Sequence, residues 1–298
     1  MPSGELEFVN ELLGSFSLDG LTVAEQRTAL ERSAAAASAG TLIEPVDANG
    51  IPSEWVTATG VTGEAVLLSL HGGAYSIGSL GTNRRFSELL SAASNRRVLS
   101  IGYRLAPEHR FPAALDDALA AYAWLLATGV APEDIAIAGN SAGGGLTLAM
   151  LVALRDRGIP LPSAAVALSA WTDLTASGES VTSCASTDVM LTARGLETSA
   201  GSYTNRERYA EPYVSPLFAD LRNLPPILLQ ASRAEILRDD STRFAARAGE
   251  SGVDVTVELY DDMPHVWHMF AGFLPEADHA IASIGRWLAT IGRPRLTR

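Results

Sequence analysis

One short turn, Gly139-Asn-Ser-Ala-Gly-Gly144, constrains the fold of this chain more than any other feature. An apolar run, Ile135–Ala138, precedes it, and a helix-like run, Gly144–Asp156, follows it. Glycines two residues before and after Ser141 allow the tight bend that a strand–turn–helix unit requires. A serine at the apex of such a turn is lifted clear of the sheet edge, which favours a nucleophilic role. The alternative is a small-residue turn before a buried helix, and further motifs decide between the two.

Short apolar runs alternate with helical patterns from about residue 41 onward. This alternation predicts a mostly parallel sheet that is covered by helices on both faces. The predicted strands are Glu54–Ala58, Ala65–Leu70, Arg97–Tyr103, Ile135–Ala138, Ala164–Ser169, Pro226–Gln230 and Val253–Tyr260. The predicted helices are Val23–Ser38, Asn83–Asn95, Ala113–Ala127, Gly144–Asp156, Asp239–Ser251 and Glu276–Ala289.

Two segments interrupt the alternation, namely residues 1–45 and residues 175–216. A long insertion at the carboxyl ends of strands usually serves as a functional lid. We therefore expect these two segments to form a helical cap over Ser141. The core of the fold is then made of residues 46–174 and 217–298.

The composition limits the partners that this chain can have. With 47% hydrophobic and 19% charged residues, its 298 residues can bury a large core, so we expect no structural metal or cofactor. The single cysteine, Cys184, excludes an internal disulfide, and a net charge of −12 opposes nucleic-acid binding. No secretory signal is visible, and the most apolar stretch, residues 118–127, is too short to span a bilayer. We expect a cytoplasmic protein without a membrane partner.

A serine nucleophile needs a base, an acid that orients the base, and an oxyanion hole. Of the five histidines, His265 is the best candidate for the base, because it lies in a short loop after the last predicted strand. His268 is the alternative. His71 lies in a glycine-containing loop after an early strand, where we expect its side chain to order the loop.

The acid is expected in the loop after the strand Pro226–Gln230, and Glu235 stands where the chain leaves that strand. Asp239 and Asp240 are the alternatives, although carboxylates at a helix start also stabilise the helix N-terminus. A salt bridge within the loop is the structural alternative for Glu235. A glutamate can perform the catalytic task, which is to fix the imidazole tautomer and stabilise the imidazolium.

The loop His71-Gly-Gly-Ala-Tyr75 can turn backbone N–H groups toward the serine. We predict an oxyanion hole made by the N–H groups of Gly72, Gly73 and Ala142. The substrate site is predicted to include Tyr75, Asn140 and Val266. For the apolar members of that set, packing in the core is the more common role.

Several motifs, in this order along the chain, make it resemble the bacterial hormone-sensitive-lipase-like (family IV) esterases of the α/β-hydrolase superfamily. The motifs are His71–Tyr75, Tyr103–His109, Phe111–Asp117, Gly139–Gly144, Trp171–Asp173, Ser215–Leu217, Leu237–Asp240 and Met263–His265. The resemblance runs from about residue 65 to the C-terminus. It implies an α/β-hydrolase fold with a helical cap and the cleavage of short- to medium-chain acyl esters without a metal. Relatives also include hydrolases of lactones and terpene-derived esters.

Three positions depart from the family pattern. Asn140 replaces the usual aspartate before the nucleophile, Ala74 replaces a glycine of the oxyanion loop, and Glu235 replaces the usual aspartate of the triad. None of these changes removes a catalytic group. Loss of the carboxylate at Asn140 is expected to alter local hydrogen bonding or pKa values.

Two other functions and one assembly are consistent with the same residues. Plant gibberellin receptors resemble this family but have lost the histidine, so a non-catalytic receptor is the first alternative. An amidase or carbamate hydrolase would use the same triad. The segment Val253–Tyr260 should form an edge strand, and pairing of this edge across a two-fold axis would give a homodimer.

Overall fold

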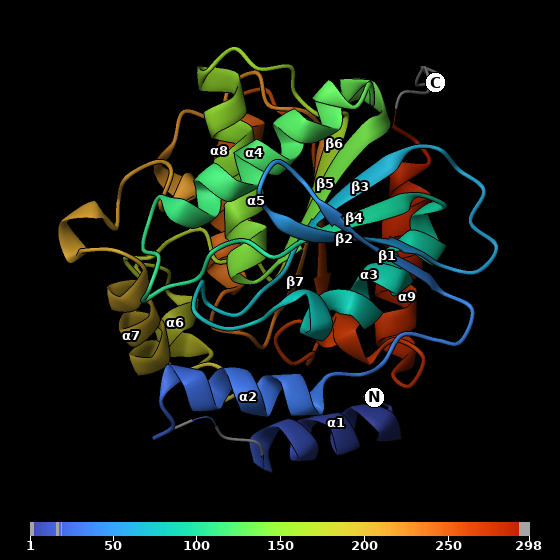
Figure 1. The fold of residues 1–298 in the computed structure, drawn as a ribbon. Coiled ribbons are helices and arrows are strands. Elements are labelled where there is room, and N and C mark those ends of the chain that lie inside the picture. The colour runs from blue at the N-terminus through green and yellow to red at the C-terminus, as the bar shows by residue number, and fades with distance from the viewer. Residues whose placement is uncertain (1–2, 16–17, 19, 292–298) are drawn as a thin grey trace, which may run out of the picture.

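The computed structural model describes residues 3–15, 18 and 20–291. Eight strands form one sheet in the order β1-β2-β4-β3-β5-β6-β7-β8 (Figure 1). The strands are β1 (Leu42–Asp47), β2 (Pro52–Thr57), β3 (Val66–Leu70), β4 (Arg97–Ile101), β5 (Ile135–Asn140), β6 (Ala164–Leu168), β7 (Ile227–Ser232) and β8 (Val255–Tyr260). β2 pairs antiparallel with β1 and β4, and the other neighbours pair parallel. The predicted α/β-hydrolase architecture is thus confirmed. β1 was not predicted, because none of its residues is fully buried and no apolar run marks it.

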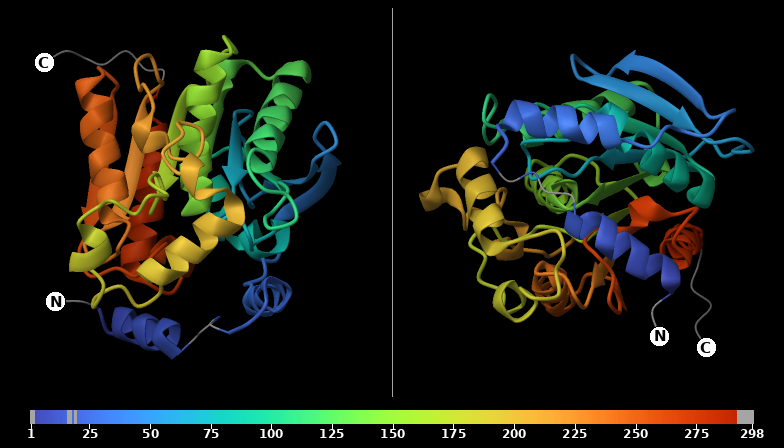
Figure 2. Two further views of the ribbon diagram at one scale, coloured as in Figure 1. Left: turned by 90° about the vertical axis from the view of Figure 1, so that its left-hand side faces the viewer. Right: turned by 90° about the horizontal axis from the view of Figure 1, so that it is seen from below.

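Helices cover both faces of the sheet. α3 and α9 lie on one face, and α4, α5 and α8 lie on the other (Figures 1 and 2). The helices are α1 (Gly4–Ser15), α2 (Val23–Ser33), α3 (Leu80–Ser94), α4 (Ala113–Ala127), α5 (Ala142–Asp156), α6 (Ser180–Ser183), α7 (Ala193–Tyr203), α8 (Arg238–Glu250) and α9 (Pro275–Leu288), with short 3₁₀ turns at Pro132–Asp134, Arg206–Arg208, Pro216–Phe218 and Trp267–Phe270. Among the residues that the structure describes, no helix is both long and apolar enough to cross a membrane.

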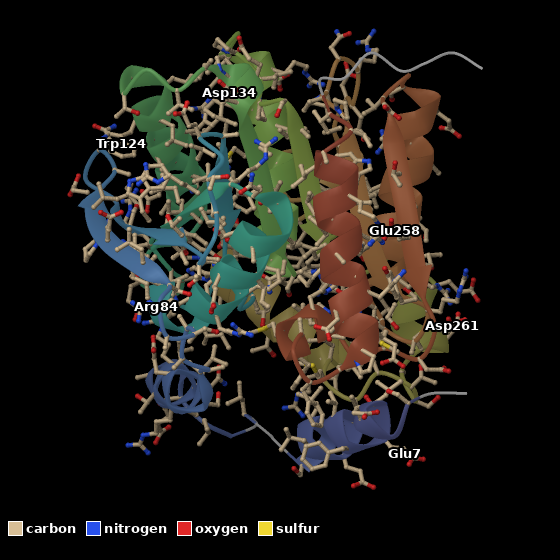
Figure 3. The ribbon with its side chains drawn as sticks, turned by 90° about the vertical axis from the view of Figure 1, so that its right-hand side faces the viewer. Glu7, Arg84, Trp124, Asp134, Glu258 and Asp261 are labelled. Atoms are coloured by element: carbon tan, nitrogen blue, oxygen red, sulfur yellow. The ribbon has the colours of Figure 1, made fainter. Side chains whose placement is uncertain are left out.

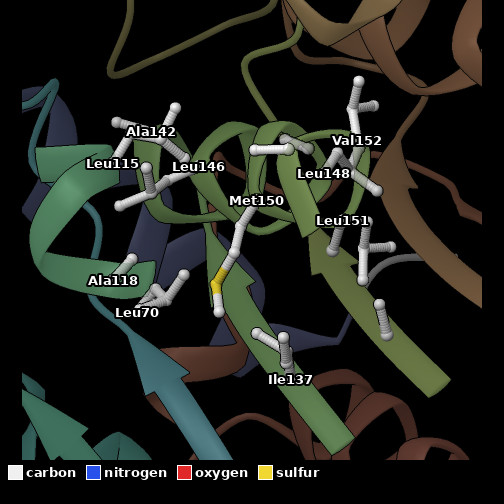
Figure 4. Close-up of a cluster of buried hydrophobic side chains, with 14 of the residues drawn as sticks. Leu70, Leu115, Ala118, Ile137, Ala142, Leu146, Leu148, Met150, Leu151 and Val152 are labelled. Atoms are coloured by element: carbon white, nitrogen blue, oxygen red, sulfur yellow. The ribbon is translucent and has the colours of Figure 1, made fainter. Parts of the chain in front are cut away.

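The central strands are buried on both faces, so their side chains feed two separate cores. In β3, Leu67 joins the core beneath α3 and α9, whereas Leu68 joins the core beneath α4 and α5. Figure 4 shows Met150 of α5 lying between this helix and Ile137 of β5. Each buried side chain of this size contributes about 1.5–3 kcal/mol to stability. The sheet therefore forms a rigid support for the loops at its edges.

The predicted helix Val23–Ser38 ends earlier than expected. The structure ends α2 at Ser33, whose hydroxyl donates to the carbonyl of Leu30 and so satisfies one carbonyl of the last turn. The next residue, Ala34, is extended, and the N–H of Ser38 donates to the carboxylate of Glu88 on α3. This contact to the core requires an extended chain instead of a continued helix.

Helices α1, α2, α6 and α7 gather at one end of the molecule (Figure 2). Arg27 of α2 donates to the carbonyls of Ser76 and Ala106, which lie in the loops after β3 and β4, and pairs with Glu108. α1 is joined to the start of α9 by a hydrogen bond from Ser3 to Glu276. The contacts of Arg27 place α2 at the carboxyl-terminal edge of the parallel strands.

Close packing of α9 on α3 gives a test of this arrangement. A Cβ at Gly285 would overlap the carbonyl oxygen of Ala93 in α3, so Gly285→Ala should lower the free energy of unfolding by about 1–3 kcal/mol. Gly249 of α8 faces open space, so Gly249→Ala is the matched control and should gain up to about 1 kcal/mol. Urea unfolding measures both variants. Equal stabilities would contradict the close approach of the two helices.

Candidate active site

The backbone at Ser141, between β5 and α5, adopts a conformation that few residues other than glycine tolerate, with φ 54° and ψ −123°. Its N–H donates to the carbonyl of Leu168, and its own carbonyl accepts from the N–H groups of Gly145 and Trp171. A Cβ at Gly143 would overlap the carbonyls of Leu70 and His71, so only glycine fits beside the turn. These contacts hold the serine at the apex that the motif predicts.

Three side chains from distant parts of the chain meet at this turn. The Nε2 atom of His265 lies 2.8 Å from the Oγ atom of Ser141, and Nδ1 lies 2.6 Å from Oε2 of Glu235. Glu235 is fully buried and His265 nearly so, whereas Ser141 is partly exposed. With its proton on Nδ1, the imidazole donates to Glu235 and accepts from the serine hydroxyl. This is the geometry that a nucleophile, a base and an orienting acid require.

The carboxylate of Glu235 has two further donors. Its Oε1 atom accepts from the N–H of Ser232 at 2.7 Å and from the hydroxyl of Ser169 at 3.0 Å. Ser169 ends the predicted strand Ala164–Ser169, and nothing in the local sequence marks it for a role at the site. Its signal lies in the strand order, since it follows β6, which neighbours the strand that precedes Glu235.

The alternative residues lie elsewhere. His268 is buried, and its Nε2 lies 2.9 Å from Oε1 of Gln230. Asp240 accepts from the N–H groups of Thr172 and Asp173, and burial and then the charge of Asp173 raise its pKa well above the usual value. Asp239 accepts from the N–H of Ser180. Neither carboxylate is bonded to His265, so the geometry selects Glu235.

The loop after β3 lies against the serine. A Cβ at Gly72 would come 3.2 Å from Cβ of Ser141, and Gly73 has a φ of 116°, in the region that favours glycine. Ala142 is the first residue of α5, so its N–H has no intrahelical acceptor. Two of the three residues predicted for an oxyanion hole, Gly72 and Ala142, therefore border the serine, and Gly73 follows Gly72 in the same loop.

His71 is part of the support of this loop. Its Nδ1 lies 2.7 Å from the carbonyl of Gly72, and its ring stacks on Tyr103 with centroids 4.1 Å apart. The hydroxyl of Tyr103 donates to the carbonyl of His71. Burial lowers the pKa of His71 to about 4, so the ring is neutral at pH 7. A neutral, stacked ring fixes the loop without adding charge beside the serine.

The residues predicted to contact substrate are all nearly buried. Tyr75 stacks on Tyr203 of α7 at 3.8 Å, Asn140 ends β5, and the N–H of Val266 donates to the hydroxyl of Ser169. Their contact with substrate stays a prediction. Among the described residues, no group of three or more His, Cys, Asp and Glu side chains is arranged to hold a metal ion.

Known proteins share this sequence and fold. A family model described as the alpha/beta hydrolase fold matches residues 67–269. An acetyl-hydrolase of Streptomyces hygroscopicus is 39% identical over 97% of this chain and 98% of its own length. An ethyl acetate hydrolase of Pseudomonas putida is 31% identical, over 74% and 71% of the two chains. A solved structure of an esterase from the bacterial hormone-sensitive lipase family is 42% identical, with a TM-score of 0.94 over 98% and 99% of the two chains.

Two buried histidines near the site should make stability depend on pH. Burial lowers the pKa of His71 to about 4 and that of His268 to about 3, from an ordinary value of 6.5. The unfolded chain therefore binds protons that the folded chain excludes, so their contribution is complete above pH 6.5 and is lost as the pH falls toward 4. At pH 5 the loss is about 2 kcal/mol for each histidine.

His268→Gln should remove about half of this loss. The glutamine amide can still donate to Gln230, so the fold should survive the substitution. Urea unfolding of the parent and the variant at pH 7 and pH 5 measures the two changes in free energy. The same loss in both proteins would contradict the assignment of this pH dependence to His268.

Proposed function

The chain belongs to the bacterial hormone-sensitive-lipase-like family of α/β hydrolases and is a carboxylic ester hydrolase, and from this premise we propose that it cleaves short- to medium-chain acyl esters through an acyl-enzyme on Ser141. The observation that carries the proposal is the pair of hydrogen bonds that links Ser141 through His265 to Glu235.

In the first half of the reaction, Oγ of Ser141 attacks the ester carbonyl while Nε2 of His265 accepts the hydroxyl proton. Glu235 holds the ring in the tautomer with a proton on Nδ1 and stabilises the imidazolium that forms. Collapse of the tetrahedral intermediate breaks the bond to the alcohol oxygen, which takes the proton from Nε2. Water then attacks the acyl-enzyme by the same route and releases the acid.

Backbone amides stabilise the negative charge of the intermediate in this mechanism. The donors in this proposal are the N–H groups of Gly72 and Gly73, in the loop after β3, and of Ala142 at the start of α5. Loss of one such donor typically raises the barrier by about 3 kcal/mol.

The names of two relatives, an acetyl-hydrolase and an ethyl acetate hydrolase, support a small acyl group. Lactones, terpene-derived esters and amides can be attacked by the same triad. The substrate class can be identified with a panel at fixed enzyme concentration. The panel varies the acyl length and the alcohol size, and it includes lactones and matched pairs of esters and amides. The highest kcat/KM for an acetyl or butyryl ester supports the proposal, and a preference for the matched amide contradicts it.

Residues 1–45 and 175–216 form the cap in this proposal. Its support is the common position of α1, α2, α6 and α7 and the stacking of Tyr203, at the end of α7, on Tyr75 of the loop after β3. The last residues of the first segment belong to β1, which begins at Leu42, so the helical part of the cap ends before that strand.

Ser141→Ala should lower the hydrolysis of p-nitrophenyl acetate by about 10⁴-fold or more, because it removes the hydroxyl that is bonded to His265 and that forms the acyl-enzyme in this mechanism. Ser163→Ala removes a hydroxyl near the opposite end of β6 and should leave the rate unchanged. Initial rates and thermal unfolding midpoints are compared for both variants. Hydrolysis at the parent rate by a folded Ser141→Ala variant would refute the mechanism.

A homodimer through β8 is the assembly that we propose. β8 is the edge strand of the sheet, and Figure 3 labels Glu258 on it and Asp261 directly after it. An exposed edge can pair with its copy across a two-fold axis.

Light scattering at micromolar concentration should give twice the mass of the chain. Val257→Pro should give a monomer, because proline removes a backbone donor from the edge strand. A monomeric mass for the parent protein would contradict the proposal.

A further inference from the structure

The residues of the triad follow strands that are not all neighbours. Ser141 follows β5, Glu235 follows β7 and His265 follows β8, and the sheet order is β5-β6-β7-β8. Neighbouring strands are about 4.8 Å apart, so β5 and β8 are separated by roughly 14 Å. The loop after β8 must therefore reach back across the sheet to place His265 beside the serine hydroxyl. Something at the end of β6 or β7 has to hold that loop in place.

Ser169 lies directly after β6 and is completely buried. Its N–H donates to the carbonyl of Gln230 on β7 at 2.7 Å. Its hydroxyl donates to Oε1 of Glu235 at 3.0 Å and accepts from the N–H of Val266 at 3.2 Å. The direction of both bonds is fixed, since a carboxylate only accepts and a peptide N–H only donates. One hydroxyl thus joins the acid to the loop that carries the base.

These bonds fix a side chain that is otherwise free to turn. The last torsion of a glutamate is broad, so the plane of its carboxylate is set by its hydrogen bonds. Ser169 and the N–H of Ser232 both bind Oε1, which leaves Oε2 for Nδ1 of His265 at 2.6 Å. On the other side, the bond to Val266 holds the residue next to His265 at a φ of 53°.

We propose that Ser169 is a positioning residue for the proposed reaction, whose hydroxyl holds Glu235 and the His265 loop in one arrangement. The inference rests on the proposed roles of those two residues. Ser169 has a φ of 46°, a conformation that glycine adopts without strain. The backbone alone would favour glycine at this position, so the reason for a serine must lie in its side chain. It acts through Glu235 and Val266 and does not take part in bond making.

Two substitutions separate the hydroxyl from the backbone strain. Ser169→Ala removes the hydroxyl and keeps the strain, and Ser169→Gly removes both. Each should lower kcat roughly tenfold to a hundredfold, because misplaced catalytic groups lose rate. The factor by which kcat falls should exceed the factor by which KM changes, because Ser169 positions the catalytic groups and is not itself predicted to contact substrate. Parent values of kcat in both folded variants would overturn the inference.

Ser91 provides a matched control. It is also completely buried, and its hydroxyl accepts from the N–H of Ala58 and donates to the carbonyl of Arg96, remote from the triad. Ser91→Ala should lower stability as Ser169→Ala does but leave kcat unchanged. If Ser91→Ala lowers kcat as much as Ser169→Ala, the effect is a general loss of stability and the inference fails.

A double-mutant cycle with Glu235→Gln tests whether Ser169 acts through the acid. The loss of kcat from Ser169→Ala should be several-fold smaller in the Glu235→Gln background than in the parent protein, because the two residues act as a unit. Fully additive losses would overturn the proposed route.

Proton NMR gives a readout that a purely structural role would not move. The Nδ1 proton of His265, assigned by its loss in His265→Ala, should shift upfield or broaden in Ser169→Ala and stay unchanged in Ser91→Ala. An unchanged signal in Ser169→Ala contradicts the inference. Failure of the proposed function itself is distinguishable, since it appears as hydrolysis by Ser141→Ala.

Discussion

The strained backbone at Ser141, with its positive φ, is the constraint on which the rest of the structure depends. A non-glycine residue at φ 54° is strained, so the surroundings must hold it. The holding bonds run to Leu168 at the end of β6, to Gly145 in α5 and to Trp171 in the loop after β6. The turn can therefore form only when β5 and β6 are paired and α5 is docked on them. Fold and nucleophile are specified by the same contacts.

The buried carboxylate of Glu235 is the second feature of the site that constrains the fold. A fully buried carboxylate is costly unless its oxygens are hydrogen-bonded. Here three donors meet it, from Ser232, Ser169 and His265, and they come from β7, from the end of β6 and from the loop after β8. The groups that compensate the burial also set the direction of the carboxylate toward the imidazole. The carboxylate is stabilised by the same arrangement that orients the base.

The sequence predicts those parts of the site that are encoded locally. The glycines around Ser141, the paired glycines after His71 and the chain order of serine, acid and histidine each depend on a short segment and its place between strands. The sheet follows from the alternation of apolar runs and helices. β1 escapes prediction because its residues lie at an exposed edge and bury too little to leave a pattern. Ser169 escapes because its function depends on which strands are neighbours, and that is a property of the sheet order.

Arg27 shows that the position of α2 also cannot be predicted from the sequence. In the sequence it is one arginine on a polar helix. In the structure, two of its three hydrogen-bonding partners are the backbone carbonyls of Ser76 and Ala106, and the third is Glu108. Carbonyls leave no signature in a sequence, because every residue has one. Ser76 lies in the loop that carries Gly72 and Gly73, and the N–H of Ser76 itself closes a turn on the carbonyl of Gly73. The position of α2 and the shape of the loop beside Ser141 are therefore linked through backbone atoms, so side-chain patterns alone could not have revealed the link.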